Sequence, residues 1–411
     1  MRSFLTPDRR RWIIVAIIFF ITVFSYVDRQ VVSILKPILK EEFSLDDSGY
    51  AMIINFFTVC YALMYPVSGW LVDRFSARKV MFWGVITWSL SSIGSGLARA
   101  LFPFVIFRSV LGLAEPTTYP AAIKVVTKWF SGRLRATANS ISVAGGTIGS
   151  VIGPPLIAWL VISSSWHAAF IIPGIIGLVV ALIWILVYRE PPRGFVQDTI
   201  SSEGDNSKSP AFTWGQLWSR KSLWGIVLIR FTTDPVWYFI LFWLPGFLME
   251  ESGLSLSQLG MVGWIPFMAA SLGGIASSAW SDWMVRRGAP PLRSRKIMLS
   301  CVAFLAPIIL IPDNLGVTVT IIKFSVLAAV ALSWIYTESV LIAETFPVNN
   351  VASVLGIAGG FGAGGAVIFN YLIGHFMSEV GTNWIFIVMA VLHPLALFIL
   401  WKMIRPEVPK L

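Results

Sequence analysis

Long hydrophobic segments follow one another along the whole chain, separated by short polar stretches. Each is 18 residues or longer, which is the length range of helices that cross the hydrocarbon core of a bilayer. The pattern therefore predicts an all-α polytopic membrane protein. We predict twelve transmembrane helices, at residues 12–38, 48–72, 79–98, 101–127, 134–162, 167–188, 222–248, 256–284, 295–312, 316–342, 350–377 and 383–403.

The composition agrees with this prediction. Of the 411 residues, 56% are hydrophobic and 13% are charged, whereas charged residues approach a quarter of a soluble domain. The two cysteines, Cys60 and Cys301, lie in apolar segments far apart in the sequence. Neither has the spacing of a disulfide framework or of a metal site, so we interpret both as small packing residues and expect no metal and no cofactor.

A polar stretch divides the twelve spans into six and six. Residues 189–221 are rich in Pro, Gly, Ser and charged residues, a composition typical of a linker. We therefore predict an N-terminal six-helix half at 1–188, a cytoplasmic linker at 189–221 and a C-terminal six-helix half at 222–411.

Internal similarity supports two related halves. Residues 129–149 and 345–365 share an aromatic start, small residues and a glycine-rich end, and 69–74 resembles 279–283. Parallel repeats of this kind place a transport site at the membrane midplane between the halves. We interpret the glycines between 356 and 365 mainly as packing positions, because small residues let transmembrane helices approach closely.

Basic residues gather on one side of the predicted membrane. They occur at the N-terminus, near 74–79, 128–135, 189–221 and 286–296, and in the tail, whereas the opposite loops hold chiefly Lys40 and Arg99. By the positive-inside rule both termini and the linker are predicted to be cytoplasmic. The net charge of +10 is explained by this topology, so we expect the bilayer and no nucleic acid as a partner.

Four charged residues lie away from the ends of the spans of the first half: Asp28, Arg29, Arg108 and Glu115. Charged groups at membrane depth are costly and usually face a protein interior or a water-filled path. Two acids and two bases cancel, as burial requires. Arg108 and Glu115 are seven residues apart, so on one helix they share a face at about 10 Å along the axis, and we expect them to pair. A purely structural role for these ions remains an alternative.

The second half contains a similar set. Arg230 and Asp234 have the i,i+4 spacing of a direct pair, and we expect Lys323 and Glu338 to balance the charge of the same half. A structural role is an alternative for each, since Lys323 could snorkel to the outer interface and Glu338 could make a local contact near the inner end. His167, His375 and His393 have no matched partner in sequence, and we expect no metal or catalytic role for them.

Several motifs together resemble a known family. The segment from Gly69 to Lys79, with Asp73, Arg74 and Arg78, resembles the cytoplasmic signature loop of the major facilitator superfamily. Residues 26–30 are similar to the first-helix motif, and 107–122 to the fourth helix, of its anion:cation symporter family. Residues 231–237 and 241–245 look most like those of hexuronate transporters. The resemblance implies a major facilitator fold, and that the acid and bases of the signature loop latch the cytoplasmic ends of the two halves.

The resemblance also implies a function. We predict a proton-coupled symporter for an organic acid anion, in which Arg29 and Arg108 bind substrate with Tyr26 and Tyr61. Asp28 and Glu115 would carry the protons, and Arg230 and Asp234 are secondary charged candidates. We predict no enzymatic activity, because no nucleophile–base set or metal cluster is evident. The protein is expected to be a monomer in the bacterial inner membrane.

One departure from the family pattern narrows the range of expected substrates. The resemblance implies a glutamine in the fifth helix of galactonate-type members, where this chain has Gly146. This favours uronates such as glucuronate or galacturonate. Aldonates, glucarate and aromatic acids such as phthalate remain alternatives, as does an anion exchanger or facilitator without proton coupling.

Overall fold

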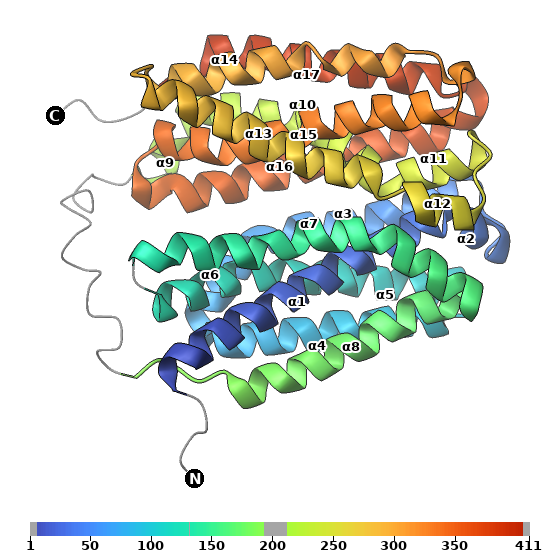
Figure 1. The fold of residues 1–411 in the computed structure, drawn as a ribbon, viewed down its shortest axis with the longest axis horizontal. Helices are drawn as coiled ribbons and strands as arrows, with labels where there is room; N and C mark the ends of the chain where they lie inside the picture. Colours follow the sequence, from blue (N-terminus) through green and yellow to red (C-terminus); the bar gives the residue numbers. More distant parts are fainter. Residues whose placement is uncertain (1–5, 131, 193–211, 406–411) are drawn as a thin grey trace. The chain divides into compact units, whose positions relative to one another are not determined.

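A computed structural model describes residues 6–130, 132–192 and 212–405 of the chain. Within these residues the structure is helical and contains no strand (Figure 1). The described chain forms two compact units, the first of Met1–Leu39 with Phe56–Gly204 and the second of Lys40–Asn55 with Asp205–Leu411. Much of the predicted linker, residues 193–211, lies outside the described residues, and the predicted boundaries at 188 and 222 stay predictions.

The helices up to residue 187 form the first unit, except for the part of α2 and α3 within Lys40–Asn55, which belongs to the second unit. They are α1 (Pro7–Ile34), α2 (Lys36–Glu42), α3 (Asp47–Phe75), α4 (Ala77–Leu97), α5 (Leu101–Ala114), the 3-10 helix η1 (Glu115–Thr117), α6 (Thr118–Trp129), α7 (Gly132–Ser163) and α8 (Trp166–Val187).

The helices that follow belong to the second unit. They are α9 (Trp214–Trp218), α10 (Lys221–Phe242), α11 (Leu244–Glu250), α12 (Leu256–Val262), α13 (Ile265–Arg286), α14 (Pro291–Ala303), the 3-10 helices η3 (Ala306–Leu310) and η4 (Asp313–Leu315), α15 (Val317–Thr345), α16 (Val348–Val380) and α17 (Asn383–Met403).

Ten helical segments of the described chain are long and apolar enough to cross a membrane. The two other predicted spans, 101–127 and 295–312, are helical but interrupted. The first is divided into α5, η1 and α6, and the second consists of α14 followed by η3. Proline explains both breaks, since Pro116 and Pro307 lack the N–H that would continue the helical hydrogen bonds. The prediction of an all-helical polytopic membrane protein is confirmed.

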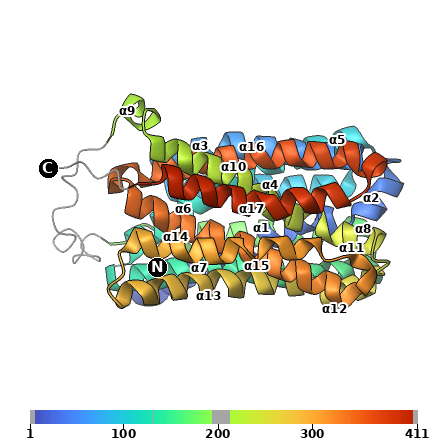
Figure 2. The same cartoon turned by 90° about the horizontal axis from the view of Figure 1, so that it is seen from above.

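Close helix packing in each unit depends on glycine. In the first unit α1 packs along α7, and a Cβ added at Gly145 would approach the carbonyl oxygen of Phe19 to 2.5 Å. In the second unit α10 packs along α16, where a Cβ at Gly365 would collide with the carbonyl of Phe231. Helices α13 and α15 also pack against each other along their length (Figures 1 and 2). The packing role expected for the glycines therefore applies to particular positions, since Gly356, Gly360 and Gly364 have open space around them.

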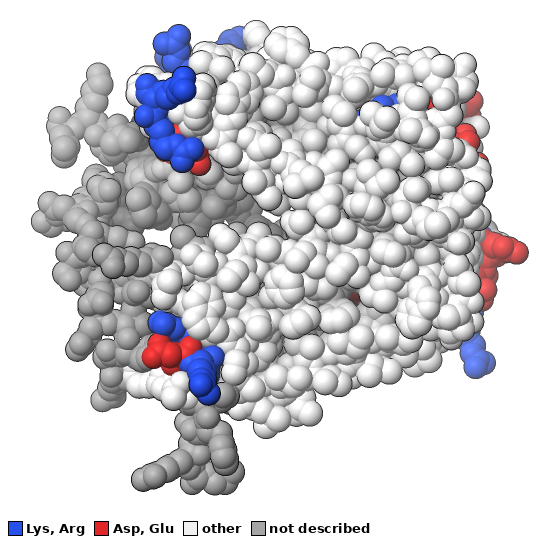
Figure 3. All heavy atoms as spheres, viewed as in Figure 1, with Lys and Arg blue, Asp and Glu red and all other residues white. Residues whose placement is uncertain are grey.

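Charged side chains avoid the middle of each unit's surface. On the face shown in Figure 3, lysine, arginine, aspartate and glutamate gather at the helix ends, and the surface between the ends is almost free of charge. Large apolar side chains from the middle of the helices, such as Leu90, Ile175 and Val391, are exposed. An exposed apolar band with charged ends is the surface that a bilayer requires.

Candidate functional site

The centre of the first unit contains a short ion pair between α1 and η1. Arg29 donates from Nε to Oε2 of Glu115 at 2.6 Å, and Oε1 of Glu115 accepts a hydrogen bond from the hydroxyl of Ser25 at 3.1 Å. The Glu115 side chain is fully buried, whereas that of Arg29 remains 13% exposed. Arg29 is therefore the member of this pair that a solute can reach.

The break in the fourth span positions Glu115. Pro116 ends the regular helix, and Glu115 begins the 3-10 turn that follows. The hydroxyl of Thr117 donates to the carbonyl of Ala114 at 2.7 Å, and that of Thr118 donates to the carbonyl of Glu115 at 2.9 Å. These bonds satisfy carbonyl groups near the break, as buried backbone requires. The acid thus lies on an irregular turn inside an otherwise apolar span.

A second ion pair lies deeper in the same unit. Nη2 of Arg108 is 3.6 Å from Oδ2 of Asp28, and both side chains are buried. Oδ1 of Asp28 accepts a short hydrogen bond from Ser92, and Nε of Arg108 donates to the hydroxyl of Ser95 at 3.1 Å. Other protein groups therefore enclose the side chains of both Asp28 and Arg108.

The two pairs correct one expectation from the sequence. Arg108 was expected to pair with Glu115, but it faces Asp28, and Glu115 instead binds Arg29. Glu115 still has helical backbone geometry, so it lies about two helical turns from Arg108, and each of the two side chains finds a nearer partner on α1. The four charges nevertheless cancel within the first unit, as predicted.

Two tyrosines surround the exposed side of Arg29. The guanidinium carbon of Arg29 lies 5.1 Å from the ring centre of Tyr26 and 4.6 Å from that of Tyr61. Such cation–π contacts hold a cation while its hydrogen-bonding edge stays available. Gly146 of α7 lies against the Tyr26 ring, since a Cβ there would come within 2.9 Å of it. A larger side chain at this position would enter the surroundings of Arg29.

The second unit contains its own charged cluster. Nε of Arg230 is 3.2 Å from Oδ2 of Asp234 and 3.5 Å from Oε2 of Glu338. The predicted Arg230–Asp234 pair is therefore present, but Glu338 of α15 shares the same guanidinium. The relative exposures of the three side chains are 21%, 5% and 2%.

Lys323, which was expected to contribute with Glu338 to the charge balance of the second half, does not contact this cluster. Its Nζ lies 2.6 Å from Oδ1 of Asp313, donates to the carbonyl of Ile311 at 2.9 Å and sits 4.5 Å from the ring centre of Phe386. Lys323 is near the start of α15 and Glu338 is fifteen residues further along, so one helix places them at different depths. These contacts agree with the alternative of a structural role for Lys323.

The signature segment lies at the end of α3 and the start of α4. Gly69 and Arg74 belong to α3, and Ser76, with a φ of 76°, is the single residue between the two helices. Arg78 donates from Nη2 to the carbonyl of Ile185 at 2.7 Å, within the first unit. The side chain of Asp73 lies outside the described part of the structure. A latching role for this segment remains a prediction.

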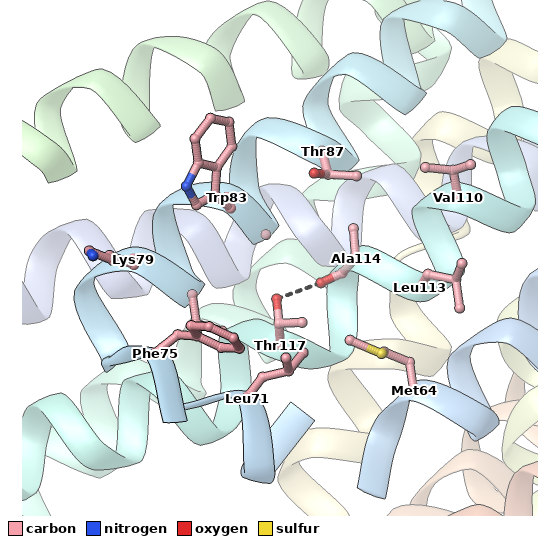
Figure 4. A pocket seen from close by; sticks show the side chains of 12 residues that line it. Met64, Leu71, Phe75, Lys79, Trp83, Thr87, Val110, Leu113, Ala114 and Thr117 are labelled. Carbon is pink, nitrogen blue, oxygen red and sulfur yellow. Dashed lines mark hydrogen bonds between the residues drawn. The ribbon is translucent and has the colours of Figure 1, made fainter. Parts of the chain in front are cut away.

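A separate groove of about 430 Å³ lies beside the break in the fourth span. Figure 4 shows Met64, Leu71 and Phe75 of α3 on one side and Trp83 of α4 on another, with Ala114 and Thr117 of the break lining it as well. Among its lining residues only Lys79 carries a charge. Glu115, between two lining residues in sequence, pairs with Arg29 instead, so this apolar groove is distinct from the ion-pair site.

Comparison with known proteins identifies the family. The sequence model of the Major Facilitator Superfamily matches residues 18–337. The chain belongs to the Major Facilitator Superfamily. It is therefore a multi-pass membrane transporter and not an enzyme, as predicted.

Relatives of this superfamily member include characterised sugar-acid carriers. This chain is 26% identical over 411 residues to the hexuronate transporter of Escherichia coli strain K12. The alignment covers 96% of this chain and 94% of that protein. It is 28% identical over 274 residues to the galacturonate transporter of Dickeya chrysanthemi, covering 64% of this chain and 79% of that protein. The D-galactonate transporter of an Escherichia coli O6:H1 strain is 29% identical over 313 residues, covering 72% of each chain. The predicted resemblance to hexuronate transporters is confirmed.

Solved structures show that the fold is that of the superfamily. A bacterial homologue of the human lysosomal transporter Spinster has a TM-score of 0.77 at 19% identity, covering 95% of this chain and 96% of that one. The D-xylose–proton symporter has a TM-score of 0.73 at 14% identity, covering 97% and 99%. These likenesses concern the fold alone.

Several polar residues that complete the two ion pairs of this superfamily member were not predicted. Ser25, Ser92 and Ser95 all donate to or accept from the charged groups. A single serine in a transmembrane helix most often bonds to its own backbone, as Ser109 does here with Val105. Their positions in the sequence were the signal that could have predicted them. Ser25 is one helical turn before Arg29, and Ser92 lies on the same helix face as Ser95.

Proposed function

We propose that this transporter imports an organic acid anion together with protons, and that the anion is a hexuronate such as glucuronate or galacturonate. The observation that carries the proposal is the Arg29–Glu115 pair, in which a partly exposed arginine is neutralised by a fully buried carboxylate. Arginine offers a planar, bidentate partner for a carboxylate. A substrate carboxylate and Glu115 therefore compete for the same guanidinium.

This competition supplies the coupling. When Glu115 takes up a proton, it no longer needs the charge of Arg29, and Arg29 can bind the substrate carboxylate. When the substrate leaves, Arg29 is left unpaired in a buried setting, which favours release of the proton from Glu115 and return to the ion pair. Asp28 and Arg108 form the second exchangeable pair of the same unit. Direct substrate binding by Arg108 stays a prediction, and in this structure its side chain faces Asp28.

The proposed substrate class rests on the relatives and on the surroundings of Arg29. The printed names of the hexuronate and galacturonate transporters specify sugar acids with a carboxylate and several hydroxyl groups. Tyr26 and Tyr61 flank Arg29 and provide phenol groups for hydroxyl recognition. Gly146 packs against the Tyr26 ring, so a glutamine at this position would displace the ring, which supports a uronate over the galactonate type.

The proposal includes the membrane and the topology predicted from the sequence. The basic ends support an inner-membrane protein with both termini in the cytoplasm, divided at 188 and 222 into two halves joined by a cytoplasmic linker. The functional unit is proposed to be the monomer.

Uptake into proteoliposomes tests this function. An imposed proton gradient should drive accumulation of labelled glucuronate or galacturonate by the wild type and not by Glu115→Gln or Asp28→Asn. Glu190→Gln serves as the matched control, because Glu190 is 49% exposed and pairs with Lys128 outside the site. Full accumulation by both site variants would show that these carboxyls do not couple transport to protons. Counterflow without gradient-driven accumulation by the wild type would identify an exchanger or facilitator.

A further inference from the structure

The charged cluster of the second unit differs from the first unit in its charge balance. In the first unit two guanidinium groups face two carboxyl groups. In the second unit one guanidinium, that of Arg230, is shared by the carboxyl groups of Asp234 and Glu338, both of which approach the same Nε atom. If both acids were ionised, the cluster would hold an excess negative charge inside the span.

No other cation of the described second unit compensates for this charge. The lysine on the same helix, Lys323, pairs with Asp313. From α14, Arg295 pairs with Asp282 and Glu344.

The charged and titratable groups on the other described helices of the second unit do not compensate for this charge either. Lys296 of α14 donates to the carbonyl of Ile404, and Glu250 of α11 faces Lys40. From α17, His393 is buried and packs on Trp334 at 5.7 Å between ring centres. Helix α16 presents Gly362 to Asp234, and a Cβ at this position would collide with its Oδ2.

Each carboxyl of the cluster also has a buried oxygen without a hydrogen-bond partner. These are Oδ1 of Asp234 and Oε1 of Glu338, and the neighbouring hydroxyl of Thr337 is unpaired as well. Two carboxylates that share one site do not both ionise, because like charges at close range in a poorly hydrated interior repel strongly. An excess buried negative charge is therefore removed by binding a cation, and the smallest is a proton.

We propose that Asp234 and Glu338 hold one proton between them, as a second proton-binding site in the second unit. Arg230 neutralises whichever carboxyl is ionised, and the proton neutralises the other. The consequence for transport rests on the proposed function: a substrate carboxylate that engages the partly exposed Arg230 would leave both acids without a counter-ion and would require a second proton. The occupancy of the site itself does not depend on transport.

Infrared spectroscopy of the purified protein tests the site directly. A protonated carboxylic acid has a C=O stretching band that a carboxylate lacks. The wild type at neutral pH should show such a band from the Asp234–Glu338 pair, and both Asp234→Asn and Glu338→Gln should lose the same single-carboxyl band, because the acid that remains ionises beside Arg230. Arg230→Gln should increase the band by one carboxyl. Glu344→Gln, on the same helix but paired with Arg295 at 3.3 Å, should leave it unchanged.

The opposite results would overturn the proposal. A band that persists in both single variants, or an unchanged band in Arg230→Gln, would mean that the two acids do not share a proton. The proton-to-substrate ratio gives a separate readout, since it should stay unchanged in Glu338→Gln, where Asp234 still takes up one proton when substrate engages Arg230, and should fall by one when Asp234→Asn and Glu338→Gln are combined. If Glu115→Gln keeps full coupling while the infrared result holds, the proposed function fails and the second proton site stands.

Discussion

Arg29 and Glu115, which are 86 positions apart in the sequence, meet through a single 2.6 Å contact between Nε and Oε2. The contact joins the first span to the 3-10 break of the fourth. Arg29 is the partly exposed member of the pair, so the proposed exchange of the Glu115 carboxylate for a substrate carboxylate takes place at Arg29.

Replacing Arg29 should weaken substrate binding most. A hydrogen bond to a charged group contributes about 1.5–3 kcal/mol, so Arg29→Gln should reduce glucuronate affinity by roughly ten- to a hundredfold. Arg29→Lys keeps the charge but loses the planar fork, and we expect an intermediate loss. Ligand-induced shifts in unfolding temperature measure this affinity. Lys128→Gln is the control; an equal loss there would contradict a specific role for Arg29.

A side chain at position 146 should change substrate choice. In Gly146→Gln the new group must displace the Tyr26 ring, which a Cβ would approach to 2.9 Å, so we expect at least a tenfold loss of uronate affinity relative to galactonate. Competition uptake with both acids measures the ratio. Gly145→Ala perturbs the packing of α7 on the Phe19 carbonyl and should leave the ratio unchanged. An unchanged ratio in both variants would remove Gly146 from the substrate site.

The hydroxyl of Ser92 should stabilise the first unit. Its single hydroxyl hydrogen can be donated to Asp28 Oδ1, and its oxygen also lies 2.9 Å from the carbonyl oxygen of Phe170. Ser92→Ala leaves an oxygen of a buried carboxyl without its donor, which costs about 1–3 kcal/mol, and should lower the unfolding temperature. Thr127→Ala removes an exposed bond within one helix turn and should have little effect. Equal unfolding temperatures for the two variants would refute this role of Ser92.

Lys40 should stabilise the second unit in a pH-dependent manner. Burial disfavours its charge, but the hydrogen bond and charge of Asp47, together with Glu250, raise the pKa of Lys40 above its ordinary value of 10.5. A raised folded-state pKa contributes stability that is fully present below the unfolded-state pKa of about 10.4 and is lost as pH rises through the folded-state value.

The unfolding temperatures of the wild type and Lys40→Met measure this contribution. Their difference should be constant from about neutral pH to pH 9 and should shrink above about pH 10.4. Lys221→Met, which changes an exposed lysine at the start of α10, should show no such trend. A difference that is the same on both sides of this pH would mean that the ion pair does not contribute.

The fold was largely predictable because hydrophobic length is a direct physical requirement of the bilayer. Spans such as 167–188 and 383–403 correspond closely to α8 and α17. The breaks at Glu115 and after Ala303 were missed because both segments satisfy the length and hydropathy criteria without being continuous helices. Pro116 and Pro307 were the available signals.

The types of residue in the site were predictable, but their partners were not. Asp28, Arg29 and Glu115 were selected because ions in apolar spans are rare, and all three lie in buried ion pairs. Pairing depends on which helices are neighbours and on the local helical geometry, neither of which follows from the spacing within one segment. For the same reason the partner of Glu338 was not predicted: it was expected only to contribute to the charge balance of the second half, and the fold brings it to Arg230.

The pH change that accompanies substrate entry tests the central claim most directly. Proteoliposomes with no imposed gradient receive glucuronate or galacturonate while the external pH is recorded. Exchange of the Glu115 carboxylate for a substrate carboxylate at Arg29 predicts that the external medium becomes more alkaline with the wild type and not with Glu115→Gln. Substrate entry into wild-type vesicles without any alkalinisation would contradict the account.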